Sequence, residues 1–154
     1  MRLRGARSSV VRLAPSVHGE TKAGFVSVLI NIARDKGVSA YIGDGSNRWP
    51  AVHYLDAARL FRLALEAAPG GSLLHGVGDE GVSIRDIAHV IGRHLNLPVV
   101  SISGKEAEAH FGFFGAFAST DNLTSSALTQ ERLGWQPAHP SLILDLEEGH
   151  YFKD

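Results

Sequence analysis

Hydrophobic and polar positions along this chain follow two periods, which predict strands and helices in alternation. Residues 9–14 form a short apolar run of β type that Pro15 stops. The apolar positions of residues 23–36 have helical spacing instead, and Gly37 follows as a natural helix C-cap. Residues 40–42 and 51–53 then predict two short strands. Residues 43–47 between them are of types that favour a turn.

Residues 55–68 give the strongest helical pattern in the sequence, and Pro69 ends it. We expect one buried stripe on this helix, made of Leu55, Ala58, Leu60, Phe61, Ala64 and Leu65. Residues 72–77 predict a strand. Ser83 then opens a helix in a pattern like a capping box, with Asp86 three residues later.

Three further segments complete the pattern. Residues 99–102 predict another strand, and a phenylalanine-rich stretch follows at residues 111–117. Helices are expected at residues 125–133 and 141–151. Strands that alternate with helices indicate an α/β fold with some parallel strand pairing. No repeat or interdomain linker interrupts the sequence, so we interpret residues 1–154 as a single unit.

Composition narrows the class of protein. The chain is 44% hydrophobic and 20% charged, as in a globular domain, and its net charge of -1 gives no field that attracts nucleic acid or an anionic membrane. The absence of cysteine excludes disulfides, thiolate metal sites and cysteine nucleophiles, and it is compatible with a cytoplasmic protein, the location we expect. The arginine-rich residues 1–9 loosely resemble a transit peptide, but a solvated lead-in is the simpler interpretation.

Residues 76–81 have the G-x-G-x-x-G spacing of a dinucleotide-binding loop, between a predicted strand and a predicted helix. Asp79 and Glu80 would place two negative charges where a pyrophosphate must lie. A helix dipole contributes only about 0.3–1 kcal/mol, too little to offset them. We therefore predict a polar loop here. The sequence also lacks a G-x-S-x-G nucleophile motif, and His89 and His94 have the wrong spacing for metal ligands on one helix face. We predict no metal site.

Two segments remain as candidates for ligand binding. Residues 15–19 follow a strand end, the position where open α/β sheets bind ligands, although a simple connection is an equal alternative. In residues 43–56, the guanidinium group of Arg48 lies next in sequence to the aromatic ring of Trp49, a combination that can bind a phosphate, a carboxylate or a ring-shaped substrate. A surface arginine beside a half-buried tryptophan is the competing interpretation. Asp56 lies near a helix N-terminus, where its charge favours the helix dipole.

At these residues the chain resembles the extended and atypical short-chain dehydrogenases/reductases, the NAD-dependent epimerase/dehydratase family. Three blocks agree with that family in order: residues 10–19, residues 43–58 and residues 133–137. The second block includes Gly43-Asp44-Gly45, Arg48, Val52-His53 and Asp56-Ala57-Ala58, and the third is Leu133-Gly134-Trp135-Gln136-Pro137. The segment from Arg48 to Asp56 is slightly longer than in sugar-nucleotide epimerases. That difference disfavours a nucleotide-sugar substrate and favours the less characterised oxidoreductase branch.

The resemblance implies the C-terminal part of a Rossmann-like fold: the last strands of a parallel sheet plus a small α/β substrate-binding region. It implies that Pro15, Ser16, Val17 and His18 line the nicotinamide end of a cleft. It likewise implies that Asn47, Arg48, Trp49 and His53 serve substrate binding, with His53 and Asp56 holding the substrate loop on its helix.

The family's N-terminal dinucleotide-binding half and its Tyr-x-x-x-Lys catalytic pair have no counterpart in the sequence. We therefore expect NAD or NADP to bind the intact family member, expect no cofactor on this chain alone, and assign no catalytic residue. The functional prediction is an NAD(P)-dependent oxidoreductase or epimerase-like protein acting on a small-molecule substrate. The alternative is a non-catalytic interaction module, self-associating through an exposed sheet edge, or an inactive truncated product.

Overall fold

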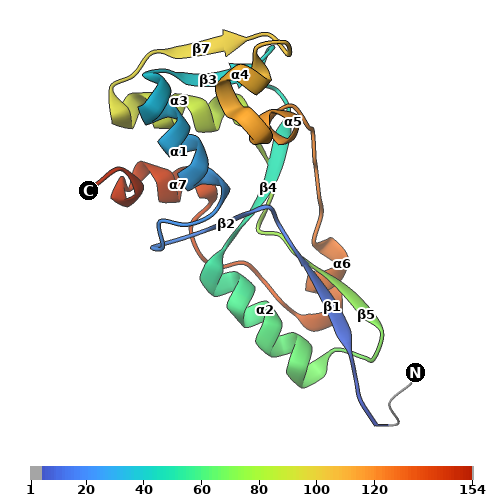
Figure 1. Cartoon of the computed structure of the whole chain (residues 1–154). Coiled ribbons are helices and arrows are strands. Elements are labelled where there is room, and N and C mark those ends of the chain that lie inside the picture. The colour runs from blue at the N-terminus through green and yellow to red at the C-terminus, as the bar shows by residue number, and fades with distance from the viewer. Residues whose placement is uncertain (1–4, 154) are drawn as a thin grey trace.

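The computed structural model of the chain describes residues 5–153, so the first four residues of the arginine-rich start lie outside it. Figure 1 shows an elongated molecule with two parts joined by strands. In the lower part, β1 (Ser9–Leu13) pairs in parallel with β5 (Ser72–Gly76), and α2 (Tyr54–Ala67) and α6 (Ala127–Leu133) pack beside them. This arrangement confirms an α/β fold with parallel pairing.

The upper part contains a second pair of parallel strands, β3 (Ser39–Ile42) and β7 (Val99–Ile102). Two longer helices, α1 (Phe25–Lys36) and α3 (Ile84–Leu95), pack against each other there. The shorter elements of this part are α4 (Ala107–Phe111), η1 (Gly112–Phe114), α5 (Gly115–Ala118), α7 (Leu142–Glu147) and η2 (His150–Phe152).

A three-stranded sheet connects the two parts. Its central strand, β4 (Arg48–His53), runs parallel to β2 (Ser16–His18) and antiparallel to β6 (Asp79–Ser83). Every residue of β4 after Arg48 is buried. The upper end of β4 enters the larger hydrophobic core through Trp49 and Ala51, whereas Val52 belongs to the smaller core beside α2.

Most local predictions are confirmed to within two residues. α1 ends at Gly37 in a left-handed conformation, and Ser83 caps α3 by accepting a hydrogen bond from the backbone N–H of Asp86 at 3.1 Å. β6 was not predicted, because Asp79, Glu80 and Gly81 have low strand propensity. The single helix expected at residues 141–151 is wrong: α7 ends before Gly149, whose φ of 80° breaks the helical path.

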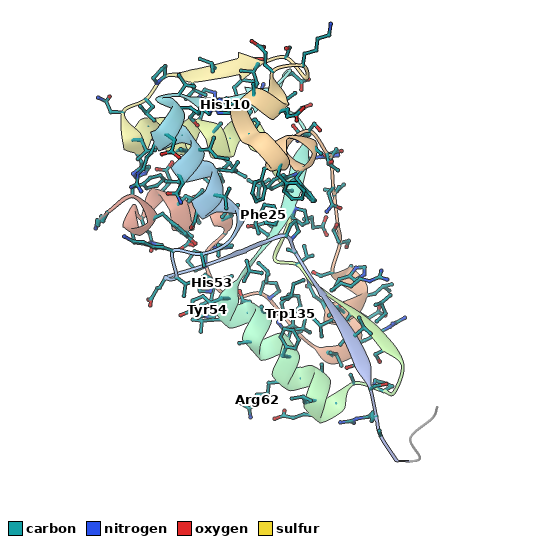
Figure 2. All side chains as sticks on the ribbon, in the orientation of Figure 1. Phe25, His53, Tyr54, Arg62, His110 and Trp135 are labelled. Atoms are coloured by element: carbon teal, nitrogen blue, oxygen red, sulfur yellow. The ribbon has the colours of Figure 1, made fainter. Side chains whose placement is uncertain are left out.

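The predicted buried stripe of α2 is correct at Leu60 and Ala64 and wrong at its other four positions, which are exposed. Its buried residues are Asp56, Ala57, Leu60 and Ala64, whereas Leu55, Phe61 and Leu65 are 43%, 45% and 79% exposed. Phe61 and Leu65 lie beside the buried face, so the apolar surface of the helix extends past the part that the described residues cover. Its outer side also bears Arg62, paired with Glu66 one helical turn away (Figure 2). Within the described residues, none of the helices is long and apolar enough to cross a membrane.

Candidate functional site

A cavity lies beyond the carboxyl end of β1, and we call it the β1-end cavity. Its volume is about 210 Å³, and it is open to solvent, because four of its lining residues are exposed. Its walls are formed by Leu13, Pro15, Phe25, Trp49, Phe117, Thr120 and Asn122. The labelled Phe25 marks its position in Figure 2, between the upper and lower parts of the molecule. Open α/β sheets bind ligands beyond the carboxyl ends of parallel strands, which is where this cavity is placed.

A second hollow of about 280 Å³ adjoins the β1-end cavity and shares Leu13, Pro15 and Asn122 with it. Its remaining lining is more polar and consists of Arg12, Ala14, Pro50, His75, Val77 and Thr124. Together the two hollows run along the end of the β1–β5 pair, with an apolar end near Trp49 and a polar end near His75.

Residues 117–124 form one wall of both hollows, and the start of β4 holds them in place. The Asn47 side-chain amide donates to the carbonyl oxygens of Ala118 and Thr120 at 2.8 and 3.2 Å. The backbone N–H of Asn122 donates to the Arg48 carbonyl at 2.8 Å. This segment is thus attached to β4 by both backbone and side-chain hydrogen bonds.

Trp49 is 4% exposed, and it contributes to this attachment through its indole N–H. That group lies 3.1 Å from the carbonyl oxygen of Phe117 and 3.2 Å from that of Thr120. The Trp49 ring packs edge to face against Phe25, with ring centres 5.3 Å apart. Trp49 therefore lines the β1-end cavity with a ring whose orientation is fixed on two sides.

Arg48 is paired with Asp121 rather than directed into either hollow. Its Nε and Nη2 atoms lie 3.1 and 2.9 Å from the two carboxylate oxygens, and its backbone N–H donates to Oδ1 at 2.8 Å. Hydrogen bonding to Asp121, followed by charge attraction, raises the pKa of Arg48. The same bonds lower the pKa of Asp121. The pair is partly exposed, so its main structural effect is to fix the position of the 117–124 segment.

Of the four residues expected at the nicotinamide end, Pro15 lines both hollows. Ser16, Val17 and His18 form β2 and pair with residues 51–53 of β4. Ser16 and His18 are only 1% and 2% exposed. The Ser16 hydroxyl has no hydrogen-bond partner among the described residues.

His18 and His53 begin a row of imidazole rings that continues to His139. The ring centres of His18 and His53 are 5.4 Å apart, and those of His53 and His139 are 4.7 Å apart in a stacked arrangement. His18 Nδ1 lies 2.8 Å from Asp145 Oδ2 at one end of the row. His139 Nδ1 lies 2.8 Å from Asp56 Oδ1 at the other end. Two buried carboxylates therefore flank the three rings.

His53 is the N-cap of α2, since its Nδ1 accepts a hydrogen bond from the backbone N–H of Leu55 at 3.2 Å. Figure 2 places His53 and Tyr54 together at the start of that helix. Burial lowers the pKa of His53, and the neighbouring His18 and His139 lower it further, whereas Asp145 and Asp56 oppose this effect. The neutral ring is therefore favoured, and it is the form whose Nδ1 can accept the capping hydrogen bond.

Asp56 was expected to hold the substrate loop, but its carboxylate binds the segment at residues 138–139 instead. It accepts hydrogen bonds from the backbone N–H groups of Ala138 and His139, both at 3.0 Å. Burial of Asp56 raises its pKa, but these bonds and His139 outweigh burial, so its pKa is lowered. The fully buried Trp135 donates its indole N–H to the Asp56 carbonyl at 2.9 Å, which fixes the same segment against α2.

The glycine motif at residues 76–81 does not form a phosphate-binding turn. The N–H of Gly78 donates to the Ala51 carbonyl at 2.8 Å, and the Asp79 carboxylate accepts from the N–H of Leu142 at 2.8 Å. Asp79 and Gly81 both lie in strand β6. The described residues thus provide no cradle for a pyrophosphate at this motif.

Asp145, Glu148 and His150 are the one group of described residues whose potential metal ligands lie within 4.8 Å of one another. Asp145 already pairs with His18, and His150 donates through Nε2 to the Gly19 carbonyl at 2.8 Å. Protein partners therefore occupy the two less exposed members of this group, Asp145 and His150.

Asp121, Phe117 and Asp145 contribute to these sites although sequence reasoning did not select them. The phenylalanine-rich segment drew attention to Phe117 only as part of a pattern. No signal in the sequence pointed to Asp121 or Asp145, because each pairs with a residue far away, 73 and 127 positions along the chain.

No model of a known protein family matches the sequence. The chain is 55% identical over 148 residues to the uncharacterized protein C2A9.02 of Schizosaccharomyces pombe, covering 96% of this chain and 50% of that protein. It is 46% identical to the uncharacterized protein YLL056C of Saccharomyces cerevisiae, covering 96% of this chain and 49% of that protein. The chain thus spans about half the length of the curated relatives it matches.

Solved structures of epimerases and dehydratases share the fold of this chain. The human epimerase family protein SDR39U1 with NADPH has a TM-score of 0.71 at 24% identity, over 99% of this chain and 52% of that one. The dTDP-glucose 4,6-dehydratase DesIV of Streptomyces venezuelae, with NAD and TYD bound, has a TM-score of 0.67 at 18% identity, over 97% and 44%. UDP-glucose 4-epimerase of Thermotoga maritima, with UDP-glucose, also has a TM-score of 0.67, at 20% identity, over 98% and 47%. The chain has the mixed α/β fold of about half of such an enzyme.

Proposed function

We propose that residues 1–154 act as one unit, the substrate-side, C-terminal portion of an NAD(P)-dependent oxidoreductase or epimerase of the short-chain dehydrogenase/reductase type. The observation that carries this proposal is the overlap of nearly the whole chain with about half of each nicotinamide-bound enzyme. The β1-end cavity supports it, because it lies where this class of sheet binds ligands. The share of each relative that is matched, about half, is also compatible with it.

The uncovered face of α2 supports the same proposal. Phe61 and Leu65, one helical turn apart, expose apolar surface beside the buried side of this helix. Exposed apolar surface next to a buried face often marks a contact with another part of a protein. Among the described residues β1 pairs only with β5, which leaves its other edge open to a further strand. We propose that a dinucleotide-binding half covers both.

In this arrangement, Pro15 to His18 lie at the nicotinamide end, with Pro15 on the cavity wall and β2 held against β4. Asn47, Arg48 and Trp49 serve substrate binding by positioning the 117–124 segment, and Trp49 also lines the cavity. His53 anchors the start of α2. The described residues offer no dinucleotide cradle and no Tyr-x-x-x-Lys pair, so we derive no chemical step on this chain.

The experiment that tests this proposal is a parallel titration of the chain and of the Schizosaccharomyces pombe relative with NADH and NADPH, following nicotinamide fluorescence. We expect saturable binding by the longer relative and none by the chain at millimolar cofactor. Absence of binding by the relative would reject the proposal. Saturable binding by the chain alone would also contradict it, because the chain would then be a self-sufficient nucleotide-binding protein.

A non-catalytic interaction module is the second candidate function, and the open edge of β1 with the exposed Val10 favours it. On this view the chain self-associates through that edge. Sedimentation velocity of the chain over a range of concentrations distinguishes the two. A stable dimer that persists while the relative binds no nicotinamide would favour the interaction module.

A further inference from the structure

We propose that the β1-end cavity binds an uncharged compound with about one six-membered ring and a hydroxyl or carbonyl oxygen, rather than a nucleoside diphosphate or its sugar ester. This inference rests on the proposed function, since it names the substrate class of the same site.

The lining of the cavity gives the first argument. Five of its residues present apolar or aromatic surface, and they are Leu13, Pro15, Phe25, Trp49 and Phe117. The other two, Thr120 and Asn122, are polar but neutral. None of these seven side chains carries a charge, so an ionised ligand would meet no opposite charge here while its contact with the apolar walls removed part of its hydration. The lining therefore selects against a diphosphate.

The Arg48–Asp121 pair gives the second argument. Arg48 is the cation at the start of β4, and a free guanidinium there would suit a phosphate. Asp121 instead accepts hydrogen bonds from Nε, Nη2 and the backbone N–H of Arg48. A phosphate that approached Arg48 would have to displace this carboxylate or lie beside its negative charge. Arg12, the other cation nearby, lines the adjoining hollow and not the β1-end cavity.

The size of the cavity gives the third argument. An apolar cavity of about 150 Å³ is large enough for benzene. The β1-end cavity has a volume of about 210 Å³, which leaves room for a six-membered ring with a small substituent. A nucleoside diphosphate, with its base, ribose and two phosphates, is several times larger than such a ring.

Asn122 gives the cavity a means of orienting the ligand. Its side-chain oxygen accepts from the Thr124 hydroxyl at 3.1 Å, and its backbone N–H donates to Arg48. Asn122 is exposed, and its side-chain NH₂ donates to none of the described residues, so it can donate to water or to a ligand oxygen. A ring held between Trp49 and Phe117 would thus present its hydroxyl or carbonyl to Asn122.

The test uses the two indole N–H signals of the purified chain in ¹H–¹⁵N spectra. Trp49 lines the cavity, and the fully buried Trp135 lies in a separate core and serves as the internal reference. The ligands are cyclohexanone, cyclohexanol and UDP. We expect both ring compounds to shift the Trp49 signal in a saturable way, with Kd on the order of 1 mM for ligands of this size. UDP is expected to shift neither signal.

Two variants sharpen the test. Asn122→Leu should weaken cyclohexanone binding about threefold to tenfold, the loss of one hydrogen bond. Asp121→Asn keeps the shape of the side chain but releases the charge of Arg48, and it should increase the affinity for UDP by about tenfold or more. Asp44→Asn, which removes an exposed carboxylate in the turn before Asn47, is the matched control and should not improve UDP binding.

Saturable binding of UDP by the unaltered chain, lost in Arg48→Gln, would overturn the inference. So would a Trp49 signal that none of the ring compounds shifts. Because no nicotinamide enters this experiment, its outcome is independent of the proposed function. If the chain binds the ring compounds but the longer relative binds no nicotinamide, the proposed function is rejected and the ligand site is kept. If the relative binds nicotinamide but the chain binds no ring compound, the ligand site is rejected and the proposed function is kept.

Discussion

His18 and Asp145 form a buried pair that joins β2 to α7 across 127 positions of sequence, with 2.8 Å between His18 Nδ1 and Asp145 Oδ2. β2 has only three residues, and its pairing with β4 is correspondingly short. A buried hydrogen-bonded pair at its end therefore contributes to holding this strand and the adjacent end of the β1-end cavity in place.

Replacing Asp145 by alanine should destabilise the chain by about 1–3 kcal/mol, because it leaves a buried imidazole N–H without an acceptor. Urea unfolding followed by circular dichroism measures this change. Glu148→Ala, which removes an exposed carboxylate just beyond the same helix, is the matched control and should change stability by less than about 0.5 kcal/mol. Equal unfolding midpoints for the two variants would contradict a structural role for the pair.

His53 should make stability depend on pH in the mildly acidic range. Its pKa is lowered in the folded chain, first by burial and then by His18 and His139, from an ordinary value near 6.5. The unfolded chain therefore binds a proton more readily, so stability is fully present above about pH 6.5 and decreases as the pH falls below it.

Asn can replace the capping acceptor of His53 but cannot titrate, so His53→Asn should reduce the slope of stability against pH between about pH 5 and 6.5. Urea unfolding at a series of pH values measures the slope. His89→Asn, which changes an exposed histidine of α3, is the control and should leave it unchanged. A slope that survives in His53→Asn would assign the pH dependence to another group.

Asp56 should make stability depend on pH in a lower pH range than His53 does. The hydrogen bonds from Ala138 and His139 outweigh the effect of burial and lower its pKa below the ordinary value of 3.8. The stability that its ionised form contributes is present above that value and is lost as the pH falls below it. Asp56→Asn should therefore be less stable than the unaltered chain at pH 7, and the difference should shrink by pH 3. Thermal unfolding at both pH values measures it, and a constant difference would contradict the assignment.

Local chemistry explains the parts of the fold that the sequence could predict. The Ser83 cap of α3 and the end of α1 at Gly37 were predictable because each depends only on residues within one helical turn. The alternation of strands and helices likewise depends on the spacing of nearby apolar residues, so the α/β class was predictable.

The buried face of α2 and the partner of Arg48 were not predictable in this way. Apolar residues such as Leu55 and Ala57 lie on opposite sides of α2, and tertiary packing alone decides which side is covered. Arg48 and Trp49 were both predicted to bind substrate, and the structure places their side chains differently. Trp49 lines the β1-end cavity, whereas Arg48 pairs with Asp121, whose position depends on the path of the 117–124 segment.

Gly19 should tolerate substitution less well than any glycine that merely caps a helix. Its φ is 146°, and a Cβ atom added there would overlap the ring of Tyr54 and approach His53 Nε2 at 3.3 Å. Its backbone N–H also donates to the Tyr151 hydroxyl at 2.9 Å, so the segment has little freedom to move away. Gly19→Ala should therefore cost about 1–3 kcal/mol from overpacking, in addition to backbone strain.

Gly37→Ala is the matched control, because Gly37 also has a positive φ, of 70°, but a Cβ atom there would meet no other atom within 4 Å. It should cost only about 1–2 kcal/mol, the strain of a left-handed conformation without a steric clash. The two variants are compared by urea unfolding, and Gly19→Ala should have the lower midpoint. Equal midpoints would mean that Tyr54 moves aside without cost, and the contact between β2 and the start of α2 would then be looser than the structure indicates.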